Sequence, residues 1–179
     1  MFAGVEPTAA ERTEARAGDE VVPHPDVVMD RAFDLPAPPD VVWPWIVQLG
    51  KARAGWYLPR GVERLVPRGR RALRHLDPTW QGLAVGDVIP DWGGRDATFE
   101  VATLHAPTAL VHRSTRGRTS LSWAITLTGR AGGTRVHLRL RLAAVRRPRL
   151  MGAVGGLFDL LTVAGLAAGL RERTRLADH

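Results

Sequence analysis

The sequence predicts a single α+β domain in which a curved antiparallel sheet wraps around a long C-terminal helix. Three observations predict this fold. A strand-like segment near the N-terminus precedes helix-like segments, the second half carries two hairpin signals, and the last segment, 150–176, has helical periodicity. The length of 179 residues suits one domain with a sizeable core.

The first 26 residues predict a disordered or loosely packed N-terminal extension, with the ligand-binding domain spanning 27–179. Pro7, Pro23 and Pro25 interrupt this extension, its charges alternate, and it has no hydrophobic period. It also lacks the apolar run of a secretory signal. The chain contains no cysteine, which removes disulfides and thiolate chemistry, so we expect a cytoplasmic location.

The first half of the domain predicts one strand and two helices. Residues 27–35 form a strand pattern that Pro36 ends. A helix is expected from Pro39, and a glycine at position 50 supplies its C-terminal stop. The apolar residues of this helix recur at helical spacing, at Val42, Ile46 and Leu49. A short helix at 61–65 and a basic loop at 67–74 follow.

The second half predicts a turn and a short strand within 82–90, followed by strands at 98–104, 109–114, 119–128 and 134–142. Strict alternation in the last two strands indicates a sheet with one covered face and one wet face. We therefore expect Trp123 and Leu138 to point inward, and His137 and Arg139 to point outward into solvent.

The C-terminal segment predicts a helix that covers the sheet. Its bulky apolar residues form one stripe, which we expect to pack inward: Leu150, Val154, Leu157, Phe158, Leu161 and Ala168. Residues 150–170 carry one charge, at Asp159, over a length that could cross a bilayer. Packing is the favoured interpretation, since the sheet needs a cover, and membrane contact through 150–170 is not expected.

This order of elements, with its sequence motifs, resembles the START-like (SRPBCC) superfamily of polyketide cyclase/dehydrase-like and ligand-binding proteins, and an actinobacterial branch of it. The resemblance covers residues 27–175. Its most specific part is Ala37-Pro-Pro-Asp-Val-Val-Trp-Pro-Trp-Ile-Val-Gln-Leu-Gly50 with Arg53-Ala-Gly-Trp-Tyr57. The resemblance implies a helix-grip fold with an internal cavity. This sequence departs from the family where His112 replaces a usually apolar residue, and in its glycine-rich, less polar last helix.

Aromatic residues are the strongest indication of an apolar ligand site. Six tryptophans in one small domain supply a large apolar area. For any single tryptophan, ordinary core is the favoured interpretation, but we expect at least two of them at the cavity. The aromatic side chains that we expect at a ligand cavity are Trp43, Trp56, Tyr57, Trp92 and Trp123.

Four polar residues complete the candidate site. His112 shares strand parity with inward-facing residues, so it could act as a general base or orient a ligand carbonyl. It could instead be satisfied by a backbone carbonyl. Gln48, Arg53 and Asp87 are candidates near the cavity mouth, and an arginine beside aromatics can bind a carboxylate or enolate. Arg53 and Asp87 could alternatively form a structural pair, which we favour slightly.

Charge and motifs narrow the function. The net charge of +7 invites nucleic-acid binding, but the arginines are spread along the chain, so we expect no nucleic-acid partner. No metal-ligand spacing, glycine-rich nucleotide loop or nucleophile elbow is present, and no cofactor or metal is expected. Two hypotheses remain: a protein that binds an apolar, aromatic or polyketide-like small molecule, and a cyclase- or dehydratase-type enzyme that uses a pocket histidine or arginine.

Overall fold

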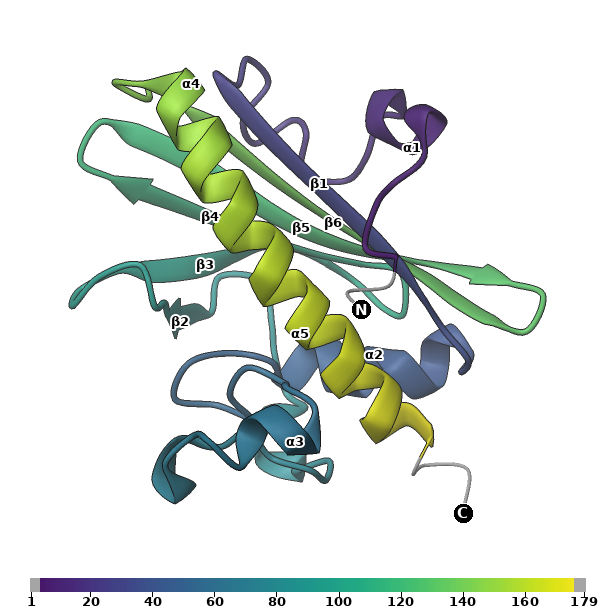
Figure 1. Cartoon of the computed structure of the whole chain (residues 1–179). Helices are drawn as coiled ribbons and strands as arrows, with labels where there is room; N and C mark the ends of the chain where they lie inside the picture. Colours follow the sequence, from purple (N-terminus) through teal and green to yellow (C-terminus); the bar gives the residue numbers. More distant parts are fainter. Residues whose placement is uncertain (1–3, 176–179) are drawn as a thin grey trace.

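The computed structural model describes residues 4–175 and contains one six-stranded antiparallel sheet (Figure 1). The spatial order of the strands is β1-β6-β5-β4-β3-β2, so the first strand lies beside the last. The strands are β1 (Val27–Leu35), β2 (Val88–Pro90), β3 (Thr98–His105), β4 (Ala109–Arg116), β5 (Thr119–Arg130) and β6 (Gly133–Ala143). This architecture confirms the predicted fold class, a helix-grip arrangement.

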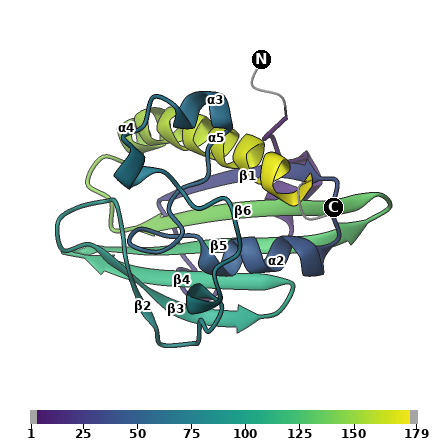
Figure 2. The same ribbon diagram turned by 90° about the horizontal axis from the view of Figure 1, so that it is seen from below.

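One continuous C-terminal helical segment crosses the inner face of the sheet (Figures 1 and 2). It consists of α4 (Pro148–Leu150), a π-helical turn (Met151–Gly155) and α5 (Gly156–Thr174). The remaining helices are α1 (Ala9–Thr13), α2 (Pro39–Gln48), α3 (Arg60–Glu63) and the short 3₁₀ turns Arg68–Arg70 and Pro78–Trp80. In α2, Pro39 occupies the first turn, where its missing N–H costs nothing.

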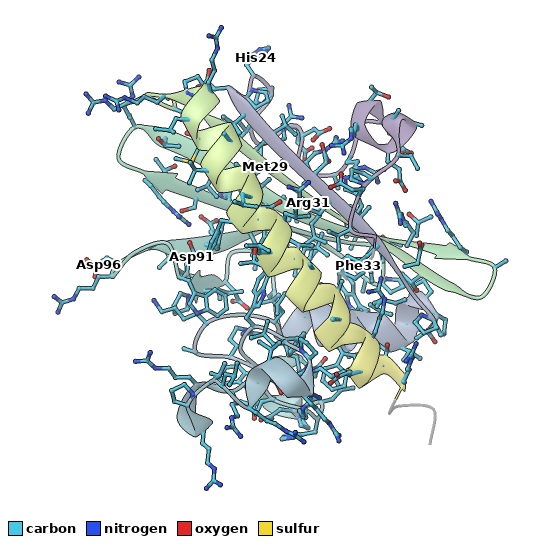
Figure 3. All side chains as sticks on the ribbon, in the orientation of Figure 1. His24, Met29, Arg31, Phe33, Asp91 and Asp96 are labelled. Atoms are coloured by element: carbon cyan, nitrogen blue, oxygen red, sulfur yellow. The ribbon has the colours of Figure 1, made fainter. Side chains whose placement is uncertain are left out.

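The strand register follows the alternation in the sequence. Trp123 of β5 pairs with Leu140 of β6, and Ile125 pairs with Leu138, all facing the helix. Met29, Arg31 and Phe33 lie along the same face of β1 (Figure 3). Because the side-chain period of a strand is two, His137 and Arg139 then point to the opposite face, as predicted.

The outer face of the sheet is not wet at β6, which corrects the expectation for His137 and Arg139. Their exposed fractions are 2% and 3%. The carboxylate of Asp30 accepts hydrogen bonds from His137 Nε2 at 2.6 Å and from Arg139 Nε at 2.8 Å. Burial opposes ionisation of Asp30, but these two partners hold its pKa below the ordinary value. Where β1 and β6 pair, the outer face is therefore a buried polar layer.

The N-terminal segment covers this layer, which corrects the expectation of disorder. Glu11 of α1 binds Arg135 through two hydrogen bonds of 2.8–2.9 Å, and Arg139 donates to the carbonyl oxygens of residues 11, 12 and 14. At Gly18, an added Cβ would lie 2.8 Å from a methyl group of Val111, so the backbone rests directly on the sheet. A polar segment packs here because arginines on the strands supply its partners.

The helix presents a different face from the one that the sequence stripe predicted. Its buried residues lie in the C-terminal half: Val163, Leu166, Ala167, Gly169, Leu170, Arg173 and Thr174. Five of the six residues of the predicted stripe, Leu150, Val154, Leu157, Phe158 and Leu161, are exposed, by 47% to 69%. The stripe prediction was wrong because the helix is apolar on both sides, and small residues allow the closer approach. At Gly169, an added Cβ would lie 2.6 Å from the backbone carbon of Tyr57.

Candidate functional site

A cavity of about 710 Å³ lies between the inner face of the sheet and the N-terminal half of the C-terminal helix. Strands β1, β3, β4, β5 and β6 supply its floor, the loop around β2 one wall, and the helix its roof. The size suits a drug-sized or polycyclic molecule. Its lining is mainly apolar: Met29, Leu49, Trp56, Ile89, Trp92, Phe99, Leu121, Trp123, Leu140, Leu142, Val145, Met151, Phe158 and Val163, with His112, Asp91, Arg116, Thr119, Asp159 and Thr162.

Five rings form one continuous aromatic wall in this cavity. Trp56 and Trp123 stack with centroids 6.1 Å apart and an interplanar angle of 27°. Trp92 meets Trp56 edge to face at 5.7 Å. His112 stacks on Trp123 at 5.3 Å, and Phe99 lies 5.5 Å from His112. Such a wall offers flat π surface to a planar apolar ligand.

Strand register and one hydrogen bond position this wall. His112 of β4 lies directly across from Trp123 of β5, so their rings stack as cross-strand neighbours. Trp56 follows α2 in the loop, and its Nε1 donates to the carbonyl oxygen of Thr162 at 3.1 Å. That bond joins the loop to α5 and satisfies the one polar atom of the indole.

His112 is the most buried polar group of the cavity, with 4% of its surface exposed. Burial lowers the pKa of His112 to about 4, so the imidazole is neutral at physiological pH. Its Nδ1 is buried and has no hydrogen-bond partner within residues 4–175. A buried polar atom without a partner costs free energy, so a ligand hydroxyl or carbonyl that paired with it would be favoured.

Two ion pairs border the same cavity. Asp91, labelled in Figure 3, pairs with Arg116, whose guanidinium lies 5.4 Å from the centroid of the Phe99 ring. On the helix side, the carboxylate of Asp159 lies 2.9 Å from Nε of Arg31. Burial raises the pKa of Asp159, although Arg31 opposes that rise. No cluster of three His, Asp or Glu side chains suited to a metal ion occurs among residues 4–175.

Four predicted site residues lie at this cavity: Trp56, Trp92, Trp123 and His112. Two others, Gln48 and Tyr57, are fully buried and have structural partners instead. Tyr57 donates its hydroxyl to the Trp45 carbonyl oxygen at 2.9 Å, and Gln48 bonds the backbone of His75 and Asp77. These bonds use the polar atoms that ligand contact would need.

Trp43, Arg53 and Asp87 also lie outside the cavity lining. Arg53 donates to the carbonyl oxygens of Val47 and Trp80, at 3.1 and 2.8 Å. Asp87 accepts the amide of Ala84 within its own turn, and it forms no ion pair with Arg53. Trp43 packs half-buried against the core. These three residues therefore do not line this cavity, and Arg53 and Asp87 do not form the structural pair that was the alternative.

Sequence reasoning missed Phe99, Asp91, Arg116 and Asp159. One signal was available for Asp159, because a lone carboxylate in an apolar helix is a candidate functional group. Arg116 is the last residue of β4 and Asp91 follows β2, and at such positions the alternation of a strand does not predict which way a side chain points. Their meeting depends on how the β2–β3 loop folds over β4.

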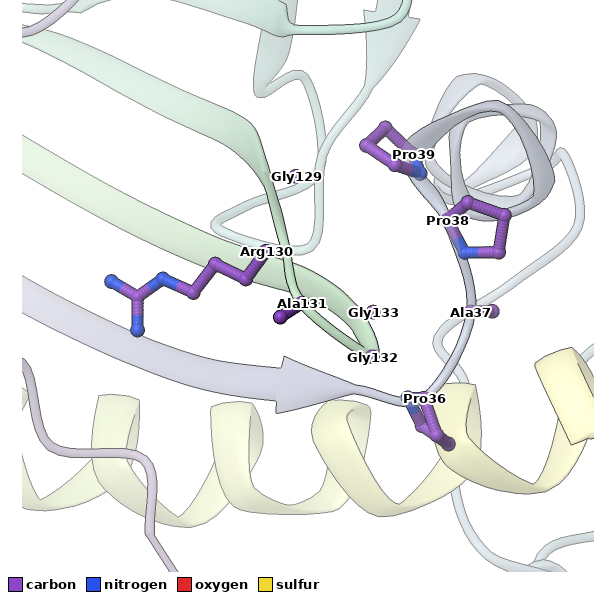
Figure 4. Close-up of a pocket in the computed structure, with 9 residues that line it drawn as sticks. All are labelled: Pro36, Ala37, Pro38, Pro39, Gly129, Arg130, Ala131, Gly132 and Gly133. Atoms are coloured by element: carbon purple, nitrogen blue, oxygen red, sulfur yellow. The ribbon is translucent and has the colours of Figure 1, made fainter.

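A second hollow, of about 620 Å³, lies where the turn after β1 approaches the β5–β6 turn (Figure 4). Prolines and glycines form most of its lining, with Arg130 as the charged residue. The Arg130 side chain extends away from the prolines in Figure 4 and binds Glu11 at 3.1 Å. This hollow has no aromatic side chain in its lining, and its one charged side chain is already paired with Glu11, so the cavity under the helix is the candidate site.

Comparisons with solved structures agree with the helix-grip fold. The chain is similar to DynU16, a protein from the dynemicin biosynthetic locus, with 22% identity and a TM-score of 0.51 over 80% of this chain and 46% of that one. This chain thus spans less than half of the DynU16 chain. A protein from Rhodobacter sphaeroides gives 18% identity and a TM-score of 0.55 over 87% and 95% of the two chains.

A third similar structure, a protein from Mesorhizobium loti, gives 17% identity and a TM-score of 0.53 over 83% of this chain and 98% of that one. At these identities the likeness is one of fold alone. No protein-family model matches the sequence, and no curated protein sequence matches it.

Proposed function

We propose that the chain binds a planar, largely apolar small molecule of aromatic or polyketide-like type in the cavity under the C-terminal helix. The observation that carries this proposal is the five-ring wall with the neutral His112 in its middle, whose buried Nδ1 has no hydrogen-bond partner among residues 4–175. Apolar contact would supply most of the affinity, and one hydrogen bond to His112 would orient the ligand. DynU16, which shares the fold, comes from a biosynthetic locus, and this supports polycyclic natural-product-like ligands as the first class to screen.

Quenching of tryptophan fluorescence by 1,8-dihydroxyanthraquinone tests the proposal directly. Three of the six indoles line the cavity, so a bound planar chromophore should quench saturably. Trp123→Ala removes the central ring of the wall and should weaken binding by roughly tenfold or more. The matched control is Trp80→Ala, because Trp80 packs under Arg53 outside the cavity.

A second variant separates ligand contact from loss of folding. Leu140→Trp adds a large side chain that projects into the cavity, so it should exclude the ligand while the fold is retained. Thermal unfolding of each variant reports the fold. Equal affinity of the wild type, Trp123→Ala and Leu140→Trp would refute binding in this cavity.

A cyclase- or dehydratase-type enzyme is the second candidate, and one observation favours it. His112 and Asp159 line the same cavity, and burial moves their pKa values in opposite directions, down for the histidine and up for the acid. Pairs of this kind can divide acid and base roles. Against it, His112 makes no hydrogen bond to Arg53 or Asp87. Turnover of a cyclisable polyketone that His112→Gln abolishes, with binding retained, would establish the enzyme.

A further inference from the structure

The N-terminal half of the C-terminal helix exposes a continuous apolar surface, here called the apolar ridge: Leu150, Met151, Val154, Leu157, Phe158 and Leu161. Each of these side chains is 45% to 69% exposed. Their spacing places them on one side of the helix, opposite the residues that pack on the sheet. Exposed apolar groups gathered in this way mark an interaction surface more often than scattered ones do.

An arginine cluster, Arg118, Arg146, Arg147 and Arg149, lies at the N-terminal end of this ridge. The last three precede or lie within α4 and are exposed. Arg118 joins them because its Nε donates to the carbonyl oxygen of Ala144 at 3.2 Å. Asp26 also lies at this end, and its carboxylate accepts a hydrogen bond from the backbone N–H of Val145 at 2.9 Å. The end of the ridge is therefore strongly positive.

The ridge also borders the mouth of the ligand cavity. Met151 and Phe158 belong to the ridge and line the cavity at the same time. Across the mouth, Trp92 lines the cavity and is 51% exposed. A half-exposed indole beside apolar side chains is typical of the boundary between lipid headgroups and acyl chains.

We propose that the apolar ridge and the arginine cluster dock the protein on an anionic lipid bilayer, with the cavity mouth facing the membrane. The arginines would meet anionic headgroups while the ridge enters the headgroup–acyl boundary, as interfacial helices do. A second copy of the chain would bring further arginines to this surface, whereas an anionic bilayer supplies the opposite charge. This inference reverses the expectation that residues 150–170 avoid membranes.

The helix would lie on the membrane and not cross it. The segment Pro148–Thr174 is long enough to span a bilayer, its most apolar window has a mean hydropathy of 1.8, and 22% of that window is buried. However, its C-terminal half carries core residues such as Leu166 and Leu170, together with Arg173, which pairs with Glu63 at 2.7 Å. Withdrawing the helix would open the core, so only the ridge is available to lipid.

Vesicle co-sedimentation of the full chain tests this proposal. Vesicles of phosphatidylglycerol mixed with phosphatidylcholine should bind the protein, vesicles of phosphatidylcholine alone should bind it far less, and rising salt should release it. Arg146→Gln with Arg147→Gln and Arg149→Gln should lower partitioning roughly a hundredfold, since each arginine near an anionic surface contributes roughly fivefold.

A ridge variant and a matched control complete the design. Val154→Ser with Leu157→Ser alters ridge residues that do not line the cavity, so vesicle binding should fall at least roughly tenfold while anthraquinone quenching stays unchanged. Leu65→Ser changes a side chain that is 85% exposed just after α3, a helix that contacts the C-terminal end of α5 through Arg60 and Glu172. This variant should bind vesicles as the wild type does.

Three results would overturn the docking proposal. They are absence of vesicle binding by the wild type, equal binding to both vesicle types at all salt concentrations, and no loss of binding in the ridge variant. A wild-type dimer that the ridge variant converts to a monomer in sedimentation velocity would assign the ridge to a second copy instead. The quenching assay reports ligand binding separately, so failure of either proposal is recognisable.

Discussion

Glu11→Gln should destabilise the protein, because Glu11 is the main anchor of the N-terminal segment. Its carboxylate accepts two hydrogen bonds from Arg135 at 2.8–2.9 Å and one from Arg130 at 3.1 Å, and it is 8% exposed. Removal of one partner of a buried pair costs about 3–5 kcal/mol. Arg135 keeps Asp34 as a second partner at 3.0 Å, so we expect about 2–3 kcal/mol.

Urea denaturation followed by tryptophan fluorescence measures this loss, and calorimetry should show a melting temperature lower by roughly 5–10 °C. Glu100→Gln is the control, since Glu100 and Arg113 form a solvent-exposed pair at 2.6 Å that should contribute less than about 1 kcal/mol. Equal shifts in the two variants would refute the anchoring role.

The pH dependence of Glu11→Gln has a defined sign. The hydrogen bonds from Arg135 hold the folded-state pKa of Glu11 well below the ordinary value of 4.5. The stabilisation is therefore present above pH 4.5 and is lost as the pH falls below it. The glutamine does not titrate, so wild type and variant should converge in stability as acid is added. A difference that stays constant down to the lowest pH at which the protein folds would contradict this linkage.

Three further outcomes are expected. Deletion of residues 1–20 should lower the melting temperature by more than about 5 °C, because it strips partners from the buried arginines, and an unchanged melting temperature would show that the segment does not pack. His112→Leu should flatten the pH dependence of stability, because the folded-state pKa of about 4 makes the wild type lose stability as the pH drops from 6.5 towards 4. If the free energy of unfolding, measured by urea denaturation at several pH values, changes with pH equally in both proteins, this prediction is contradicted. Gly169→Ala should destabilise by about 2 kcal/mol or more, through contact with the Tyr57 backbone, whereas Gly156→Ala meets open space and should stabilise by up to about 1 kcal/mol; calorimetry compares them.

Local pattern was sufficient for the strands and for the order of elements. Strand β1 spans the predicted residues 27–35, and the inward side chains of β5 and β6 follow the alternation of the sequence. Side chains alternate between the two faces of a strand, so when one set is apolar and the other charged, only one assignment of faces is favourable. The inward direction of Trp123 and Leu138 could therefore be predicted from the sequence. The inward direction of His112 followed from the same parity.

Only the tertiary structure decided which tryptophans meet in the cavity. Trp43 lies on α2 and packs against the core, whereas Trp56 lies in the loop that binds α5 through Thr162. The two residues are similar in sequence context, and the difference between them arises from a contact 106 residues apart along the chain. Helical and strand periods carry no information about such distant partners.

Two further features could not be predicted from the sequence for the same reason: which face of the C-terminal helix packs, and what covers the outer side of the sheet. The C-terminal helix is apolar around most of its circumference, so its sequence pattern predicted a helix but not which side would pack on the sheet. The side that carries Gly169 packs inward, because the missing Cβ lets the backbone of Tyr57 approach closely. The N-terminal segment has no hydrophobic period, and its order comes from arginines more than 100 residues away. Amino-acid pattern determines local structure, but charge pairing and close approach between distant segments act only once the chain has folded.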